Sequence, residues 1–202
     1  MKAYTDDLQL VMKALSDYKP CNEQECRDKI FIMNCVENMD NIFTRDNICC
    51  HITVSAWVLN KSCDKVLMAY HNIYNSWAWL GGHADGNKNL QAVALKEAME
   101  ESSVKNISLL TDEIFSIEVL TVDGHVKNGE YISSHLHLNF TYALQADENE
   151  SLSVKEDENS DVAWLSFDEI FKKSNEEWFK NNIYNKLVDK TIKCFAAAGK
   201  EL

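Results

Sequence analysis

Residues 80–104 read LGGHADGNKNLQAVALKEAMEESSV, and this stretch decides the fold. It starts with a strand end and a double glycine, Gly81-Gly82, and continues through a polar loop into a helix. Asn89 is a favourable N-cap residue, because its side-chain oxygen can accept a backbone N–H of the first helical turn. We therefore predict a helix from about Asn89 to Ser102.

Three glutamates of this helix, Glu97, Glu100 and Glu101, lie at positions i, i+3 and i+4 and so share one face. Each like-charged pair destabilises an isolated helix by about 0.2–0.5 kcal/mol, and a divalent cation would turn this repulsion into coordination. Hard carboxylate ligands favour Mg²⁺ or Mn²⁺. The backbone carbonyl of Gly82 could complete the site, since glycine lets a backbone approach a ligand closely. The structural alternative is an ordinary acidic surface helix with Lys96 as an ion-pair partner.

Apolar residues lie on two sides of this helix. One group shares the stripe of the glutamates, which is therefore not fully solvated: Leu90, Val93 and Ala94. We expect the group on the opposite side to pack on a core: Ala92, Leu95 and Met99.

The stretch resembles the Nudix box, whose pattern is G-x5-E-x7-R-E-U-x-E-E-x-G-U, with U a bulky apolar residue. The positions that fit are Gly82, Glu97, Glu100, Glu101 and Val104.

Three positions of the box depart from the pattern. Lys88 stands where the family has glutamate, which removes a secondary acidic group. Lys96 stands where the family has arginine, so the charge is kept but the bidentate fork is lost. Ser103 replaces a glycine after the helix, where a left-handed residue other than glycine costs about 1–2 kcal/mol. We therefore expect the helix to end differently here.

A second element supports the resemblance, which covers about residues 49–173. Trp164, Glu169 and Ile170 are similar to the closing W-x-x-x-x-E-L element of the family. The resemblance implies an α/β fold, a Nudix-like α/β/α sandwich with a mixed sheet. A helical N-terminal extension, residues 1–48, would precede the catalytic domain, residues 49–202, which includes a C-terminal helix.

The resemblance also implies a metal-dependent hydrolase that cleaves the pyrophosphate bond of a nucleoside diphosphate linked to another moiety. Gly82, Glu97, Glu100 and Glu101 would hold Mg²⁺ or Mn²⁺. Glu97, or a carboxylate of the acidic loop 147–161, would take the proton of the attacking water, and Lys96 would orient Glu97. The sequence does not choose between the loop candidates, which are Glu156, Glu158 and Asp161.

The substrate is expected to resemble ADP-ribose, partly because three tryptophans offer stacking surfaces or, alternatively, pack internally: Trp57, Trp77 and Trp79. The runner-up function is a nucleotide-binding module with little or no hydrolysis, which the box departures motivate. A third hypothesis, an isoprenoid diphosphate isomerase, would need a catalytic cysteine, and Cys63 lies in a predicted hairpin turn unsuited to that role.

Composition narrows the partners and the compartment. The 202 residues carry a net charge of −12, which argues against binding to a nucleic-acid backbone. We find no signal-peptide pattern and no apolar run of membrane-spanning length. Seven cysteines without a CxxC pair indicate free thiols in a cytoplasmic protein.

The remaining chain shows alternating helix and strand signals. We predict helices over residues 4–18, 23–38 and 175–198, and a capping box that starts a helix at Ser166-Phe-Asp-Glu169. We predict strands over residues 49–58, 65–71, 76–80, 113–122, 131–145 and 162–165. Two interpretations of the N-terminal helices stay open. They pack on the core or on a second subunit of a homodimer, or they form a lid or specificity element.

His135 and His137 share one face of a predicted strand and form a tempting metal pair. We interpret them instead as part of a polar strand face, because no third ligand is evident nearby in the sequence. Substrate contact is the better functional hypothesis for His137. Zinc ligation by Cys21, Cys26 and His51 is disfavoured, since their spacing fits no known structural pattern.

Overall fold

The structure is a computed structural model that describes residues 6–127, 129–154 and 159–195. The chain forms two compact units, each assembled from three segments. The first contains Met1–Ser55, Gly82–Ala94 and Thr111–Tyr142, and the second contains Ala56–Gly81, Leu95–Leu110 and Ala143–Leu202. The division into an extension, 1–48, and a catalytic domain, 49–202, stays a prediction. Among the described residues we find no helix with the length and apolarity that a bilayer crossing needs.

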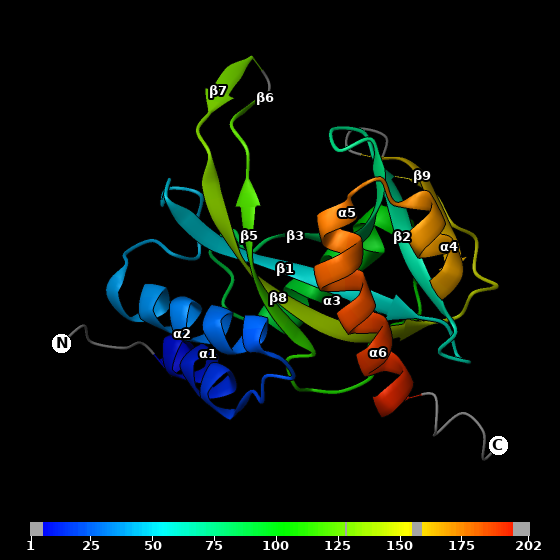
Figure 1. Ribbon diagram of the computed structural model, residues 1–202, viewed down its shortest axis with the longest axis horizontal. Coiled ribbons are helices and arrows are strands. Elements are labelled where there is room, and N and C mark those ends of the chain that lie inside the picture. The colour runs from blue at the N-terminus through cyan, green and yellow to red at the C-terminus, as the bar shows by residue number, and fades with distance from the viewer. Residues whose placement is uncertain (1–5, 128, 155–158, 196–202) are drawn as a thin grey trace. The chain divides into compact units, whose positions relative to one another are not determined.

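Two helices begin the first unit, α1 at Asp6–Asp17 and α2 at Glu23–Asn38. They pack against each other at the blue end of the ribbon in Figure 1. The predicted start of α2 is confirmed, because Asn22 caps the helix by accepting a hydrogen bond from the backbone N–H of Glu25 at 2.9 Å. Pro20 lies in the connector, where its missing N–H prevents a continuation of α1.

A strand pair and a hairpin complete the first unit. β5 (Ser116–Val122) and β8 (His135–Ala146) pair antiparallel, with Glu118 opposite Asn139, and α2 packs on β5. A short hairpin of β6 (His125–Lys127) and β7 (Glu130–Ile132) connects them and extends beyond their ends in Figure 1. The polar face of β8 is buried, since the side-chain amide of Asn139 accepts from Thr53 and donates to Glu118.

The second unit contains β2 (Lys65–His71), which pairs antiparallel with three strands. These are β1 (Cys50–Leu59), β3 (Ser76–His83) and β9 (Asn159–Ser166). A short strand that the sequence did not predict, β4 (Ile107–Leu109), pairs with β8.

The strand order is β4-β8-β1-β3-β2-β9, with β5 paired to β8. β1 and β3 are neighbours in this order and are both antiparallel to β2, so they run parallel to each other. The sheet is therefore mixed, as predicted.

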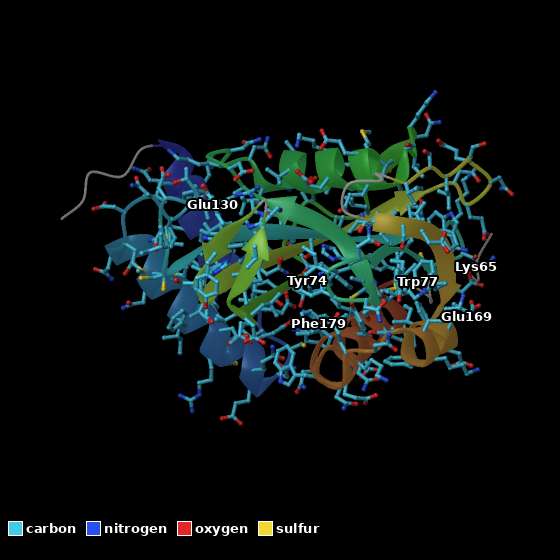
Figure 2. The ribbon with its side chains drawn as sticks, turned by 90° about the horizontal axis from the view of Figure 1, so that it is seen from above. Lys65, Tyr74, Trp77, Glu130, Glu169 and Phe179 are labelled. Carbon is cyan, nitrogen blue, oxygen red and sulfur yellow. The ribbon has the colours of Figure 1, made fainter. Side chains whose placement is uncertain are left out.

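α4 (Phe167–Lys173) follows β9 directly. The predicted capping box is confirmed: the Ser166 hydroxyl accepts from the Glu169 backbone N–H, and the Glu169 carboxylate accepts from the Ser166 N–H at 2.9 Å. Lys65 starts β2 opposite Ser166, and Figure 2 shows Lys65 near Glu169.

The predicted final helix, residues 175–198, is divided into three parts. α5 (Glu177–Phe179) leads into a π-helical turn, η1 (Lys180–Tyr184), and then into α6 (Asn185–Cys194). A π turn inserts one extra residue and rotates the face that follows, which the sequence periodicity did not reveal. Tyr184 is fully buried there and stacks on Trp57, with ring centroids 6.2 Å apart. Residues 196–198 lie outside the described residues.

Candidate active site

The predicted box helix is α3, which spans Leu90–Ser102. Its N-cap is confirmed, since the side-chain oxygen of Asn89 accepts a hydrogen bond from the backbone N–H of Ala92 at 3.1 Å. The first and last residues of α3 thus agree to within one residue with the predicted range, about Asn89 to Ser102.

The buried face of α3 differs from the expectation. Met99 is 38% exposed, and Ala92 and Leu95 are only half-buried, so the prediction that these three face the core is wrong. The buried side chains are instead those on the stripe of the glutamates: Leu90, Val93, Ala94, Ala98 and Glu101. Small residues on this stripe let the helix pack closely, and that packing carries Glu101 into the interior.

Glu101 is the most constrained of the three glutamates. It is only 5% exposed, and its Oε2 accepts a hydrogen bond from the backbone N–H of Gly81 at 2.9 Å. Its Oε1 accepts from the side-chain amide of Asn159 at 3.2 Å. These hydrogen bonds fix the carboxylate in one orientation.

Glu97 and Glu100 converge on a single cation. The Lys96 ammonium lies 3.0 Å from Oε1 of Glu97 and 3.2 Å from Oε2 of Glu100. These hydrogen bonds, to Glu97 first and then to Glu100, raise the pKa of Lys96. The Lys96 side chain is 59% exposed, so solvent reaches the ammonium in this position.

These observations test whether the residues fit a divalent metal. The donors are carboxylate oxygens, and two of the carboxylates already attract one positive charge. The donor set therefore fits a hard cation such as Mg²⁺ or Mn²⁺. Gly82 directly follows Gly81 in β3 and belongs to the first unit, whereas the glutamates belong to the second. Its predicted role as a ligand stays a prediction.

A family model described as NUDIX domain matches residues 51–187. The chain belongs to the Nudix family. Solved Nudix structures share its fold at low identity. A NUDIX-family hydrolase from Clostridium perfringens is 23% identical with a TM-score of 0.50, over 70% of this chain and 95% of that chain. A C. elegans Ap4A hydrolase in a binary complex is 14% identical with a TM-score of 0.51, over 73% and 98% of the two chains. No curated protein sequence matches the chain.

Membership of the family makes this chain a Nudix-type pyrophosphohydrolase. The fold class predicted from the sequence is confirmed: a Nudix α/β/α sandwich with a mixed sheet, preceded by N-terminal helices and followed by a C-terminal helix. The match ends at residue 187 and so includes η1, beyond the limit of residue 173 expected from the sequence.

The residue before the last position of the Nudix box is strained. Ser103 has a φ of 62°, the left-handed conformation that the family glycine would adopt without strain. The expectation that the helix would end differently is therefore wrong. Neighbouring hydrogen bonds hold the turn, since the backbone N–H of Ser153 donates to the carbonyl of Ser102 at 3.0 Å. Lys88 lies just before the helix and is half-buried.

The acidic loop gives only part of the expected set. Glu156 and Glu158 lie outside the described residues. Asp161 is exposed on β9, where its carboxylate accepts from the backbone N–H of Val162 at 2.8 Å. From the same region it is Asn159, which the sequence reasoning missed, that reaches Glu101. The sequence did contain a signal for this contact. Asn159 is a polar residue with a donating side chain, and it lies five residues before Trp164 of the closing element.

The three tryptophans pack within the protein. Trp57 is fully buried and donates from Nε1 to the hydroxyl of Thr191 at 2.9 Å, so it offers no surface to a ligand. Trp77, labelled in Figure 2, is buried and has the Lys173 ammonium 5.5 Å from its ring centroid. Trp79 packs edge-on against its neighbours Phe179 and Tyr184.

Cys63 also fails the requirement of the isomerase hypothesis. It lies in the turn between β1 and β2 and is buried, and this burial raises the pKa of its thiol. A reactive catalytic cysteine needs the thiolate form, which this environment disfavours.

Proposed function

We propose that this Nudix hydrolase cleaves the pyrophosphate bond of a nucleoside diphosphate linked to another moiety, and that the reaction depends on Mg²⁺ or Mn²⁺. One observation carries the proposal. Glu101 is fixed by two hydrogen bonds, while Glu97 and Glu100 converge on the Lys96 ammonium. A box helix that only covered the surface would not need a buried glutamate with dedicated donors.

The residues of the box take separate roles in this reaction. A bound divalent cation would neutralise the diphosphate oxygens and acidify the attacking water. Glu97, Glu100 and Glu101 would hold the cation, and the Gly82 carbonyl is proposed as a further ligand. Glu97 accepts the proton of the water, and Lys96 keeps its carboxylate oriented through the 3.0 Å contact. Asp161, Glu156 and Glu158 are the alternative bases.

The substrate class follows from charge and from the family resemblance. A protein with a net charge of −12 repels a polyanion unless metal neutralises it, so a small diphosphate is favoured over nucleic acid. We propose an ADP-ribose-like substrate. Trp57 does not stack on it, because this side chain is fully buried. All seven cysteines are free thiols, which supports a cytoplasmic location. A homodimer stays a prediction from the sequence.

The second candidate is a nucleotide-binding module on the Nudix scaffold. Three observations favour it: lysine at two box positions, Lys88 and Lys96, and the strained Ser103 at the helix end. In this case a nucleotide would raise the melting temperature and remain intact through long incubation with Mg²⁺.

The test is phosphate release from a panel of nucleoside diphosphate derivatives, including ADP-ribose, with Mg²⁺ or Mn²⁺ present. A phosphatase that acts only on monoesters converts the products into free phosphate. We expect turnover of one class, abolished by a chelator and by Glu101→Gln, while circular dichroism shows an intact fold. Lack of turnover across the panel with retained Mg²⁺ binding would favour the binding module. Full activity of Glu101→Gln would contradict the site assignment.

A further inference from the structure

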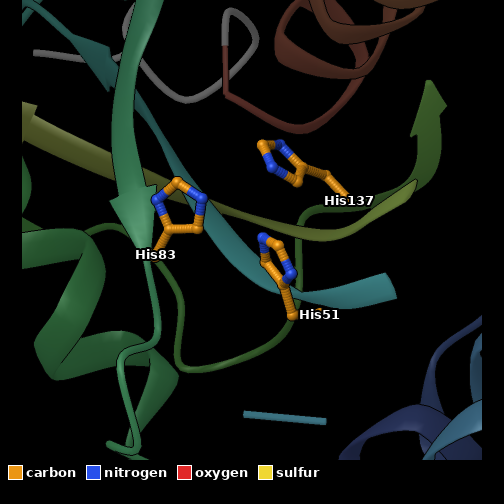
Figure 3. A group of neighbouring side chains, drawn as sticks. All are labelled: His51, His83 and His137. Carbon is orange, nitrogen blue, oxygen red and sulfur yellow. The ribbon is translucent and has the colours of Figure 1, made fainter. Parts of the chain in front are cut away.

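Four histidines lie close together in the first unit, and none of them belongs to the helix that carries the box glutamates. His51 comes from β1, His83 from the end of β3, and His135 and His137 from β8. One ring nitrogen from each of His51, His83 and His137 lies within 4.8 Å of the other two. Figure 3 shows these three rings turned toward one another.

The hydrogen bonds of two of these rings fix the tautomer that a metal requires. Nδ1 of His51 lies 3.2 Å from the carbonyl oxygen of Asn47, and Nδ1 of His135 lies 2.9 Å from that of Ser133. A carbonyl can only accept, so in each ring Nδ1 carries the proton and Nε2 presents a lone pair. Metal-binding histidines typically have such a carbonyl partner on the far nitrogen.

The lone pair of His51 has no partner. Its Nε2 is buried and makes no hydrogen bond within the described structure. The whole residue is only 5% exposed, so bulk water does not satisfy this atom. Buried polar atoms are almost always satisfied, so an orphaned acceptor beside other imidazoles needs an explanation. Nε2 of His135 lies 3.3 Å from Nε2 of His137, and because the His135 atom is an acceptor, Nε2–H of His137 donates in this hydrogen bond. His137 therefore has to change tautomer before it can bind a metal through Nε2.

We propose that His51, His83 and His137 bind a transition-metal ion of the zinc type, with Nε2 of His135 as the fourth ligand. Zinc prefers nitrogen ligands in a tetrahedral arrangement at about 2.0–2.1 Å, which places ligand nitrogens roughly 3.3 Å apart. The contact between His135 and His137 already has this separation, and the other rings need small rotations to reach it. Imidazole ligands select this class of metal against Mg²⁺.

The site has a route to solvent. A surface hollow with a volume of about 440 Å³ is lined by His135 together with Cys49, Asp123 and Ser134. His135 is the histidine of the cluster that lines this hollow, so in the proposed site it is the exchangeable ligand and the other three are the fixed ones. The proposal is independent of the function proposed for the glutamates.

The test measures Zn²⁺ binding by the purified full-length protein after metal removal, in competition with a colorimetric chelator. We expect one Zn²⁺ per chain, unaffected by millimolar Mg²⁺. His51→Gln, His83→Gln and His137→Gln should each weaken binding by more than about 100-fold, since loss of an outer partner alone costs 10–100-fold. His135→Gln should weaken it by about tenfold.

His125→Gln is the matched control. His125 also has Nδ1 at 2.9 Å from a carbonyl, that of Asp123, but it is not part of the cluster. Its substitution should leave Zn²⁺ affinity unchanged. Wild-type protein that binds no Zn²⁺, or cluster variants that bind like wild type, would overturn the proposal, as would an equal loss in the control.

X-ray absorption of the zinc-loaded wild-type protein decides the case even if the variants do not fold. Three or four nitrogen scatterers at about 2.0–2.1 Å support the proposal. A sulfur scatterer at about 2.3 Å would reject it, because that distance marks cysteine ligands.

Discussion

The two clusters of this molecule offer opposite solutions to holding a cation. The glutamates of α3 are carboxylate donors, with Glu101 buried and the Glu100 side chain 46% exposed, and a lysine lies between Glu97 and Glu100. Among the histidines, His51 is buried and its Nε2 has no hydrogen-bond partner in the described structure. Carboxylate oxygens favour hard cations such as Mg²⁺, whereas imidazole nitrogens favour metals of the zinc type. The two sites should therefore differ in metal preference.

The clusters also differ in how the sequence encodes them. Glu97, Glu100 and Glu101 fall within five residues, so helical periodicity alone places them on one face. The histidines come from three strands, and His51 and His137 are separated by 85 intervening residues. Only the folded sheet brings them together. A local motif therefore predicted the first cluster, whereas the local pair of His135 and His137 marked only part of the second, without its ligands from the other strands.

The largest expected effect is a separation of the two sites by single substitutions. Glu101→Gln should lower turnover by at least about 100-fold, the loss expected when one preorganised charge is removed from a catalytic site. The same variant should bind Zn²⁺ within about twofold of wild type. His51→Gln should do the opposite: it should lose Zn²⁺ affinity and keep its turnover. Both quantities are measured on each variant, by coupled phosphate release and by chelator competition.

An intact melting transition is the control for both variants. If Glu101→Gln lost Zn²⁺ binding while remaining folded, the clusters would not be independent and the comparison would fail.

Lys96 offers the next effect, because it is the cation of the first cluster. Lys96→Met should lower kcat by about 10–100-fold, the typical cost of losing a residue that orients a ligand. Lys96→Arg keeps the charge and restores the family residue, so its kcat should stay within about threefold of wild type. Initial rates over a range of Mg²⁺ concentrations give both kcat and the Mg²⁺ requirement. Equal activity of Lys96→Met and wild type would show that Lys96 only forms a surface ion pair and does not orient a catalytic carboxylate.

Asn159 tests a smaller contribution to the same cluster. Asn159→Ala removes the donor at 3.2 Å from the buried carboxylate of Glu101, and should lower turnover by about tenfold. Asp161→Asn is the matched control two residues later, exposed and bonded to its own neighbour. We expect it to change turnover by less than about twofold. A larger loss in Asp161→Asn than in Asn159→Ala would instead identify Asp161 as the base.

The elements with local signals were predictable. α2 lies over residues 23–38 as expected, Asn89 caps α3, and the Ser166–Glu169 capping box starts α4. Each depends on residues within a few positions of each other, where backbone geometry alone determines the contact.

Long-range packing was not predictable. The sequence predicted that the side of α3 with Met99 packs on the core, but packing buries the stripe of Val93 and Ala94 instead. All residues of β1 are buried, including the polar Thr53 and Ser55, which lie between apolar neighbours in the sequence. Those two hydroxyls are satisfied by Asn139, which lies more than 80 residues away in the chain.

The smallest expected effect concerns Ser103, where the box departs from glycine without touching the chemistry. A left-handed serine costs about 1–2 kcal/mol, and glycine loses about 0.4–1 kcal/mol through the greater freedom of the unfolded chain. Ser103→Gly should therefore raise the free energy of unfolding by about 0.5–1 kcal/mol, measured by urea denaturation.

Ser108→Gly is the matched control for that substitution. Ser108 is exposed in β4 and has no positive φ, so glycine there should lower the free energy of unfolding by about 0.5–1 kcal/mol. Turnover should be unchanged in both variants, because neither serine contacts the glutamates. Higher turnover in Ser103→Gly without a gain in stability would show that the helix end positions Glu101. In that case the strained turn would belong to the first cluster, and the departure at Ser103 would limit catalysis rather than folding.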